Sequence, residues 1–134
     1  MRIDEFSFRS GKKILASRPA LFASVLAALV NAQEAHLRRP NISKAEHLRR
    51  EFLAECWSKG ESLEPRFSFL KERIAVQILF SDRDFLRFIS AFKSGQIDAG
   101  VLIVASRSKL NRVKADLVWL RSTITIPIWV VALK

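Results

Sequence analysis

One stretch constrains the fold more than any other, because it places a strand, a helix and a second strand in succession: RIAVQILFSDRDFLRFISAFKSGQIDAGVLIV, from Arg73 to Val104. Alternating apolar residues predict a strand over residues 74–80, with Gln77 and Leu79 on one face. An apolar stripe at helical spacing follows and ends at Gly95. The uninterrupted run AGVLIVA then predicts a central strand that is covered on both faces.

The flanking segments extend this pattern into an α/β fold. Pro19 opens an apolar helix of about 14 residues, and Ser43 with Glu46 forms a capping box at the start of the next helix. A basic amphipathic helix and the strand IPIWVVAL close the chain. The predicted order is α, α, β, β, α, β, α, β, which gives a four-stranded mixed sheet flanked by helices.

The run FSFLKER predicts a further strand, antiparallel to residues 74–80. Simple alternation places Phe67 and Phe69 on one side of this strand, and Ser68 and Leu70 on the other. The two strands form a hairpin directly before the long helix.

The 134 residues contain no repeat and no Pro/Gly-rich linker, so we expect one domain over 1–134 with a loosely ordered N-terminus over 1–18. A single cysteine excludes a disulfide framework and fits a reducing, cytoplasmic setting; we expect Cys56 to be a small core residue. The start of the chain has no apolar region typical of a secretory signal. The first helix is shorter than the roughly 20 residues that a membrane span requires, so no membrane contact is expected.

The chain is strongly basic, with 23 Lys and Arg against 13 Asp and Glu, a formal net charge of +10. Such a balance favours a polyanion as partner, because every phosphate that is neutralised releases counterions. One cluster surrounds the turn between the first two helices: Arg38, Arg39, Lys44, Arg49 and Arg50. A second cluster follows the central strand: Arg107, Lys109, Arg112, Lys114 and Arg121. The alternative is that each cluster is only a solvated basic surface.

The stretch FSFLKERIAVQILFSDRDFLRFISAFKSGQIDAGVLIVAS resembles the BglII-like type II restriction endonucleases of the PD-(D/E)XK nuclease superfamily. That family has an Asp, then FVK-x-R-VAVE, an RDL helix start, and ID-VGV-I in the next strand. The residues that keep this pattern are Phe69, Lys71, Arg73, Ala75, Val76, Arg83, Asp84, Ile97, Asp98, Gly100, Val101 and Ile103. Trp57 also fits the family's Trp before the catalytic hairpin. The resemblance covers Ser43 to Ala105 and implies a nuclease-like core.

The departures from the family pattern fall on its chemistry. The resemblance implies that the first metal-binding Asp corresponds to Ser68, the central Glu to Gln77 and the third site residue to Leu79, all three converging on one face of the hairpin. Family members cleave DNA by gathering carboxylates around Mg²⁺. Serine and glutamine are neutral, weak ligands for Mg²⁺, and leucine is none. We therefore predict no catalytic residues, no metal site and no cofactor.

Other carboxylates could in principle have replaced the missing ones. Glu34 fits a solvated helix face, and Glu72 points away from Gln77. Asp82 and Asp84 fit the first turn of a helix, which favours acids, and Asp98 fits a turn at the start of a strand. The two histidines, His36 and His47, are expected on polar helix faces.

These observations lead to a hypothesis and two alternatives. The hypothesis is a catalytically inactive restriction-endonuclease-like protein that binds DNA or acts as a non-cutting subunit. The first alternative is an active endonuclease with migrated carboxylates and Mg²⁺, and the second is a protein-interaction module that has lost DNA binding. The resemblance implies a homodimer, or a heterodimer with an active nuclease, and it places DNA-contacting segments after the central strand.

Overall fold

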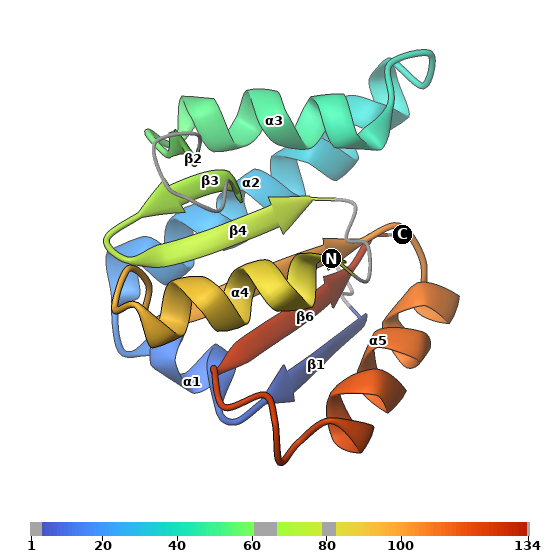
Figure 1. Cartoon of the computed structure of the whole chain (residues 1–134). Helices are drawn as coiled ribbons and strands as arrows, with labels where there is room; N and C mark the ends of the chain where they lie inside the picture. Colours follow the sequence, from blue (N-terminus) through green and yellow to red (C-terminus); the bar gives the residue numbers. More distant parts are fainter. Residues whose placement is uncertain (1–3, 61–66, 79–82, 134) are drawn as a thin grey trace.

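The computed structural model describes residues 4–60, 67–78 and 83–133. Within these residues, six strands form one mixed sheet in the order β1-β6-β5-β4-β3-β2, with helices on both faces (Figure 1). The strands are β1 (Asp4–Phe8), β2 (Ser58–Gly60), β3 (Phe67–Lys71), β4 (Ile74–Ile78), β5 (Ala99–Val104) and β6 (Ile128–Ala132). The helices are α1 (Gly11–Ala16), α2 (Pro19–Arg38), α3 (Lys44–Ala54), α4 (Arg83–Lys93) and α5 (Arg107–Trp119). The predicted α/β class is confirmed, with six strands in place of four.

The centre of the sheet is parallel and its margins are antiparallel. β4, β5 and β6 pair in parallel, whereas β3 pairs antiparallel with β4, β2 with β3, and β1 with β6. The three parallel strands therefore end on the same side of the molecule, at the right in Figure 1. We call this side the carboxyl end of the sheet; in open α/β sheets it is where ligands usually bind.

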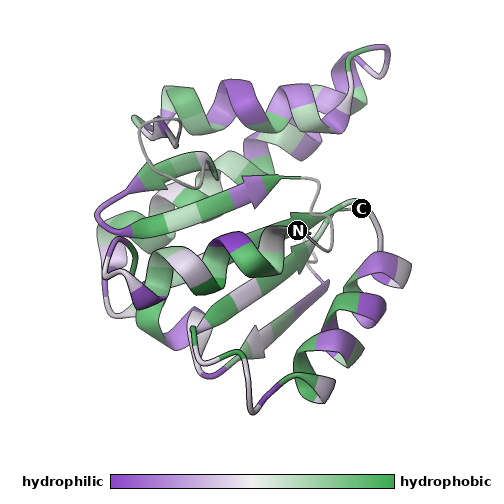
Figure 2. Cartoon of the chain, viewed as in Figure 1, coloured by the Kyte–Doolittle hydropathy of each residue, from purple (hydrophilic) through white to green (hydrophobic). Residues whose placement is uncertain are grey.

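The sheet separates two apolar cores. On β5, Ala99, Val101 and Ile103 face the core under α1, α2 and α3, whereas Leu102 and Val104 face the core under α4 and α5. Every residue of β5 is buried, as predicted for a central strand. Figure 2 shows the same division, with apolar strands between helices that alternate polar and apolar residues. The periodicity of the sequence thus defines both faces of the sheet.

The N-terminus differs from the expected loose segment, because residues 4–8 form β1 and 11–16 form α1. β1 pairs with β6 over its whole length, and its last residue, Phe8, is buried in the core under α4 and α5. A five-residue strand has no stability of its own, so only this pairing orders it. α1 can approach β6 closely because Gly11 has no Cβ atom. A Cβ at this position would lie 2.3 Å from the backbone carbonyl carbon of Ile128.

The predicted alternation on β3 is wrong at Ser68. Lys59 pairs with Phe69, but the next residue, Gly60, pairs with Phe67, so Ser68 is an extra residue in a β-bulge. The bulge turns the two phenylalanines to opposite faces. Phe69 joins the core under α1, α2 and α3, whereas Phe67 joins the core under α4 and α5.

The first long helix, α2, has 20 residues, more than the apolar segment expected from the sequence. By length and composition alone it could cross a membrane. One side of it, however, is buried against the sheet through Leu21, Ser24, Val25, Ala28, Leu29 and Ala32. The buried Trp57 donates its indole N–H to Ser24 Oγ at 3.0 Å, which ties α2 to the chain after α3. α2 therefore packs as a core helix of the domain.

Two predictions near α3 are wrong. The helix ends at Ala54, and Cys56 lies in the following turn with φ of 64°, where its side chain is exposed. His47 is buried, and its Nε2–H donates to the Arg39 carbonyl oxygen at 3.1 Å. His47 therefore holds the turn between α2 and α3 in place, and it is not on an exposed polar helix face as predicted.

At the opposite end of the sheet, Asp98 joins two segments that are far apart in the sequence. Its Oδ2 accepts from Arg18 Nη2 at 2.7 Å, and its Oδ1 accepts from Arg73 Nε at 3.0 Å. Arg18 also donates to the carbonyl oxygen of Glu72 at 2.6 Å, within the β3–β4 turn. The hydrogen bonds from Arg73 and then Arg18 hold the pKa of Asp98 below its ordinary value.

Replacing Asp98 with Asn is expected to lower the free energy of unfolding by about 1 kcal/mol at pH 7, because both ion pairs are partly exposed. Because the pKa of Asp98 is lower in the folded state, the ionised carboxylate stabilises the fold, and this stabilisation is complete at pH values above the ordinary carboxyl pKa. It is lost as the pH falls from about 4 towards the folded pKa. Urea unfolding of both proteins at several pH values should therefore show the difference shrinking in acid. Glu72→Gln is the control, and parallel pH profiles for Asp98→Asn and the wild type would contradict the prediction.

Candidate nucleic-acid interface

Ser68 and Gln77 converge on the β3–β4 hairpin, as predicted. The last backbone pair of the hairpin is Phe69 with Val76. Beyond this pair, hydrogen bonds that involve side chains connect the two strands. Gln77 Oε1 accepts from Ser68 N at 3.0 Å and from Ser68 Oγ at 3.3 Å. Ser68 Oγ in turn accepts from Ile78 N at 3.1 Å. Neutral hydrogen bonds therefore close the place where the resemblance expects metal ligands.

This donor set does not fit Mg²⁺, which prefers several oxygen ligands, with carboxylates among them. The oxygens of Ser68 and Gln77 carry no charge, and both already accept hydrogen bonds from the hairpin. The third position, Leu79, lies outside the described residues, as does Asp82. Asp84 lies in α4, but the structure does not describe its side chain.

The remaining carboxylates considered from the sequence do not approach the hairpin site. Glu34 is exposed on α2, and Glu72 is exposed in the turn at the opposite end of β4. Asp98 is bound by Arg18 and Arg73 at that same end. Across residues 4–60, 67–78 and 83–133, no three His, Cys, Asp or Glu side chains form a group that could hold a metal ion.

Among the described residues, three cations and one carboxylate line the space beside Ser68. A pocket of about 350 Å³ opens beside it, and its lining is Glu46, Arg49, Arg50, Leu53, Lys59, Phe67, Ser68 and Phe69. α3 supplies the two arginines, and β2 supplies Lys59 by pairing with β3. No sequence pattern pointed to Lys59, because a three-residue strand has no periodicity. We call this the Ser68 pocket.

A second pocket of about 400 Å³ adjoins the first through Arg50, and its lining is Ala35, Arg38, Arg39, His47, Arg50 and Glu51. The turn that carries Arg39 is fixed by both histidines. His36 Nδ1–H donates to the Ile42 carbonyl oxygen at 3.0 Å, and His47 binds the Arg39 carbonyl oxygen. Lys44, at the first position of α3, is half-buried. Four of the five residues of the first predicted basic cluster, Arg38, Arg39, Arg49 and Arg50, thus line two adjoining pockets on α2 and α3.

The second basic cluster lies on α5. Ser106 caps this helix by accepting from Lys109 N at 3.3 Å. Four of the cluster's five side chains stand on the helix and are exposed, namely Arg107, Lys109, Arg112 and Lys114, and the exposed Arg121 follows the helix. Lys114 Nζ lies 5.3 Å from the centre of the Phe6 ring on β1, a cation–π contact that fixes its direction.

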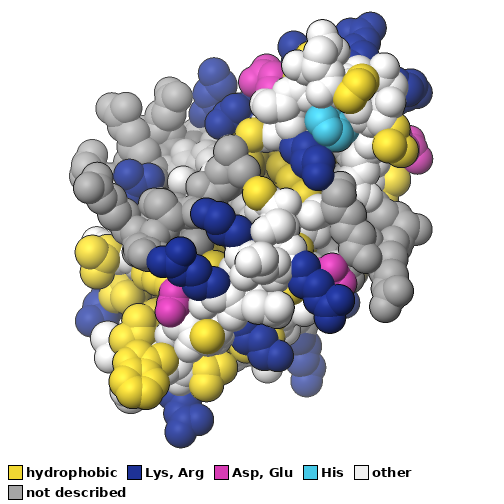
Figure 3. All heavy atoms as spheres, turned by 90° about the vertical axis from the view of Figure 1, so that its right-hand side faces the viewer, with side chains coloured by type: hydrophobic (Ala, Val, Ile, Leu, Met, Phe, Trp, Pro, Cys, Tyr) yellow, Lys and Arg dark blue, Asp and Glu magenta, His cyan; other side chains and the backbone are white. Residues whose placement is uncertain are grey.

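Both clusters meet on one side of the protein. Figure 3 shows the molecule from the carboxyl end of the sheet, with Lys and Arg side chains distributed from the α2–α3 region at the top to α5 at the bottom. The Ser68–Gln77 pair lies towards the same end, since Gln77 is close to the end of β4. A single positive face of this kind can bind a polyanion over some length.

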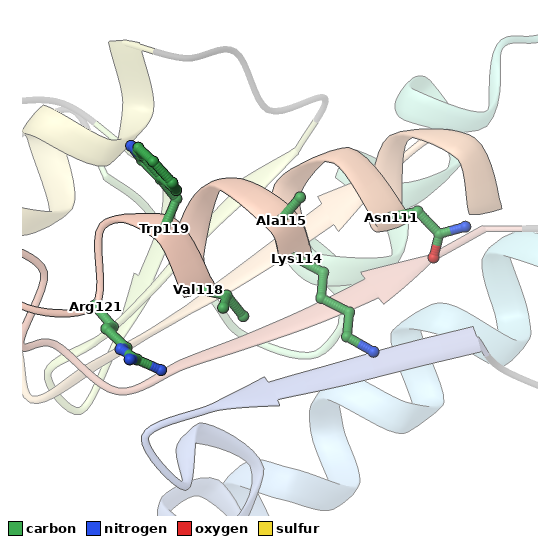
Figure 4. A pocket seen from close by; sticks show the side chains of 6 residues that line it. All are labelled: Asn111, Lys114, Ala115, Val118, Trp119 and Arg121. Carbon is green, nitrogen blue, oxygen red and sulfur yellow. The ribbon is translucent and has the colours of Figure 1, made fainter.

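The outer side of α5 adds an aromatic surface to this charge. An open pocket of about 750 Å³ is lined by Asn111, Lys114, Ala115, Val118, Trp119 and Arg121 (Figure 4). Trp119 is 85% exposed, whereas Trp57 and Trp129 are buried. The Trp119 indole points away from the Lys114 and Arg121 side chains (Figure 4), so it is an exposed aromatic surface next to the basic one.

The family model described as "Restriction endonuclease BglII/BglIII" matches residues 3–133, nearly the whole chain. No curated protein and no solved structure matches the chain.

Proposed function

This chain belongs to the BglII/BglIII restriction endonuclease family, and we propose that it is a catalytically inactive member that binds DNA without cutting it. Membership of the family implies an interaction with DNA. The loss of cleavage is our inference from the residues that now stand in the hairpin site. The same protein could act alone on DNA or as the non-cutting subunit of a larger nuclease.

One observation carries the proposal: Gln77 Oε1 accepts from both Ser68 N and Ser68 Oγ. A glutamate in that place would offer a charged oxygen to a metal ion, whereas this amide oxygen is neutral and engaged within the hairpin. Cleavage of this type needs a metal ion to polarise the phosphate and to activate water. The hairpin therefore offers neutral internal hydrogen bonds at the positions where the family pattern has metal-binding carboxylates.

The positive face supports DNA as the partner. Arg107 and Lys109 stand in the first turn of α5, where backbone N–H groups also favour an anion. Arg38 and Arg39 stand at the end of α2. Contacts of these side chains with phosphates hold a duplex in place without reading its sequence. We therefore expect binding that depends strongly on salt and little on sequence.

Three further features belong to the same proposal. We infer that residues 1–134 act as one domain, because both apolar cores share a single sheet. We also infer a cytoplasmic protein, since its one cysteine is exposed and unpaired. By analogy with the family, we propose a homodimer or a heterodimer with an active nuclease, which light scattering with and without such a partner would distinguish from a monomer.

The DNA-binding part is tested by the salt dependence of affinity. A plot of log affinity against log salt should fall steeply for any duplex, by about 0.9 for each phosphate neutralised. Replacing Arg107 and Lys109 together with Ala should reduce the slope by about 2 and weaken binding to all duplexes alike. The matched control is Lys93→Ala, an exposed charge in the last turn of α4, away from the carboxyl end of the sheet. An unchanged slope in the double variant would remove α5 from the interface.

The proposed lack of cleavage is tested by incubating supercoiled plasmid with the protein in the presence of Mg²⁺ or Mn²⁺. We expect no cleavage above that of a mock preparation. Metal-dependent cleavage would contradict the proposal and would favour migrated carboxylates. Absence of both cleavage and DNA binding at low salt would instead favour an interaction module.

A further inference from the structure

We propose that the Ser68 pocket binds one phosphate group of the DNA backbone directly, with Arg49, Arg50 and Lys59 supplying the positive charge. This inference rests on the proposed function and concerns the chemistry of one site within it. In this chain, fixed cations stand beside the position where the family pattern has metal-binding carboxylates. The site has changed from one that would collect a metal ion to one that would collect an anion.

The fold brings these cations together from separate elements. Arg49 and Arg50 project from the middle of α3, and α3 is fixed to the sheet by Phe52, which is stacked on Phe69 with ring centres 5.3 Å apart. Lys59 comes from β2, which pairs with β3 next to the bulge. The bulged Ser68 lies in the lining between them. The pocket is therefore framed by one helix, α3, and two neighbouring strands of the sheet, β2 and β3.

The charge in the pocket is positive. Among the described lining residues, Glu46 is the one carboxylate, and it faces both arginines at 3.6 Å from Arg49 and 3.4 Å from Arg50. These distances are long for ion pairs, and all three side chains are about half exposed, so the pairs contribute little. Three cations against one carboxylate leave a net positive charge that a phosphate can neutralise.

The chemistry of the cations suits phosphate. A guanidinium group presents its N–H donors in a planar fork that matches two phosphate oxygens, and a lysine ammonium group adds a mobile charge. A volume of about 350 Å³ leaves room for a phosphate and part of its sugar. Because the side chains provide the charge, binding needs no divalent ion. Insensitivity to chelation is therefore the property that separates this pocket from a metal-assisted site.

The test measures affinity for a short duplex in buffer with EDTA, for the wild type and for three single variants. Lys59→Ala should weaken binding by about 10-fold, the value of one charge-assisted hydrogen bond. Glu46→Gln should tighten binding by about 3-fold, because it removes the competing negative charge. Lys93→Ala, remote from the pocket, should leave the affinity nearly unchanged. A purely structural role of the pocket residues would not make one variant bind more tightly, and circular dichroism checks that all variants fold.

Titration with inorganic phosphate provides the second measurement. We expect the backbone amide signals of Ser68 and of residue 59 to shift in the wild type and to shift far less in Lys59→Ala. Duplex binding that needs Mg²⁺, or that is equal in Lys59→Ala and the wild type, would overturn the pocket proposal and leave DNA binding intact. If the wild type fails to bind any duplex, the proposed function is wrong. The phosphate titration then tests the pocket proposal by itself, and amide signals that do not shift on addition of phosphate would refute that proposal.

Discussion

Replacing Gly100 with Val is expected to lower the free energy of unfolding by about 3 kcal/mol, a large effect for a single substitution. A Cβ atom at Gly100 would lie 2.2 Å from Cε1 and 2.5 Å from Cδ1 of Phe88. Phe88 cannot turn aside easily, because it is fully buried and packs against Phe67 with ring centres 5.0 Å apart. Valine would therefore push α4 away from the centre of the sheet. Urea unfolding followed by circular dichroism measures the loss.

Two further variants show whether this contact is the cause. Gly95 has a φ of 75° with nothing near its Cβ position, so Gly95→Ala introduces backbone strain without a collision and should cost only about 1 kcal/mol. Combining Gly100→Val with Phe88→Leu should recover part of the loss, since the smaller side chain leaves space for the methyl groups. Purely additive effects of the two substitutions would mean that the contact is not responsible.

Replacing Phe52 with Ala is the second substitution with a large expected effect, about 3–5 kcal/mol. Phe52 is fully buried, stacks on Phe69 and meets the edge of Trp57 with ring centres 5.5 Å apart. The truncation leaves a cavity between α3 and the sheet, and α3 carries Arg49 and Arg50. We therefore expect weaker DNA binding as well as lower stability, even at temperatures where the variant remains folded.

Phe52→Leu is the matched control, because it keeps most of the volume and should cost much less than the alanine variant. Trp57 reports the local change: its fluorescence should become more accessible to a neutral quencher in Phe52→Ala than in Phe52→Leu. Trp119 is exposed in every variant, so the comparison is made in a Trp119→Phe background. If Phe52→Ala loses stability but keeps the full DNA affinity of the wild type, α3 does not contribute to the interface.

The family pattern in the sequence included Gly100 without giving a physical reason for it. The structure supplies one, since a ring of α4 occupies the space of a Cβ atom at this position. In the same way, Trp57 fitted the family pattern, and the structure places it in a buried hydrogen bond with Ser24. Such reasons depend on residues that are far apart in the chain, so no local pattern contains them.

The sequence by itself determined the elements with a clear periodicity. The alternation over β4, the continuous apolar run of β5 and the apolar stripe of α4 each specify which side chains are buried, because a strand repeats every two residues and a helix every 3.6. The capping of α3 by Ser43, which accepts from Glu46 N at 3.1 Å, is equally local. The replacement of carboxylates at Ser68 and Gln77 is also a property of the sequence alone.

Only the tertiary structure decided the rest. β1 and β2 are too short to carry a periodic signal and are ordered by their pairing with β6 and β3. The bulge at Ser68 arises from the same pairing, and it separates Phe67 from Phe69 against the local alternation. Lys59 reaches the pocket only because β2 joins the sheet. The two basic clusters share one face because the α2–α3 turn and the start of α5 lie at the same end of the sheet, which depends on the packing of the helices and not on the residues of any one segment.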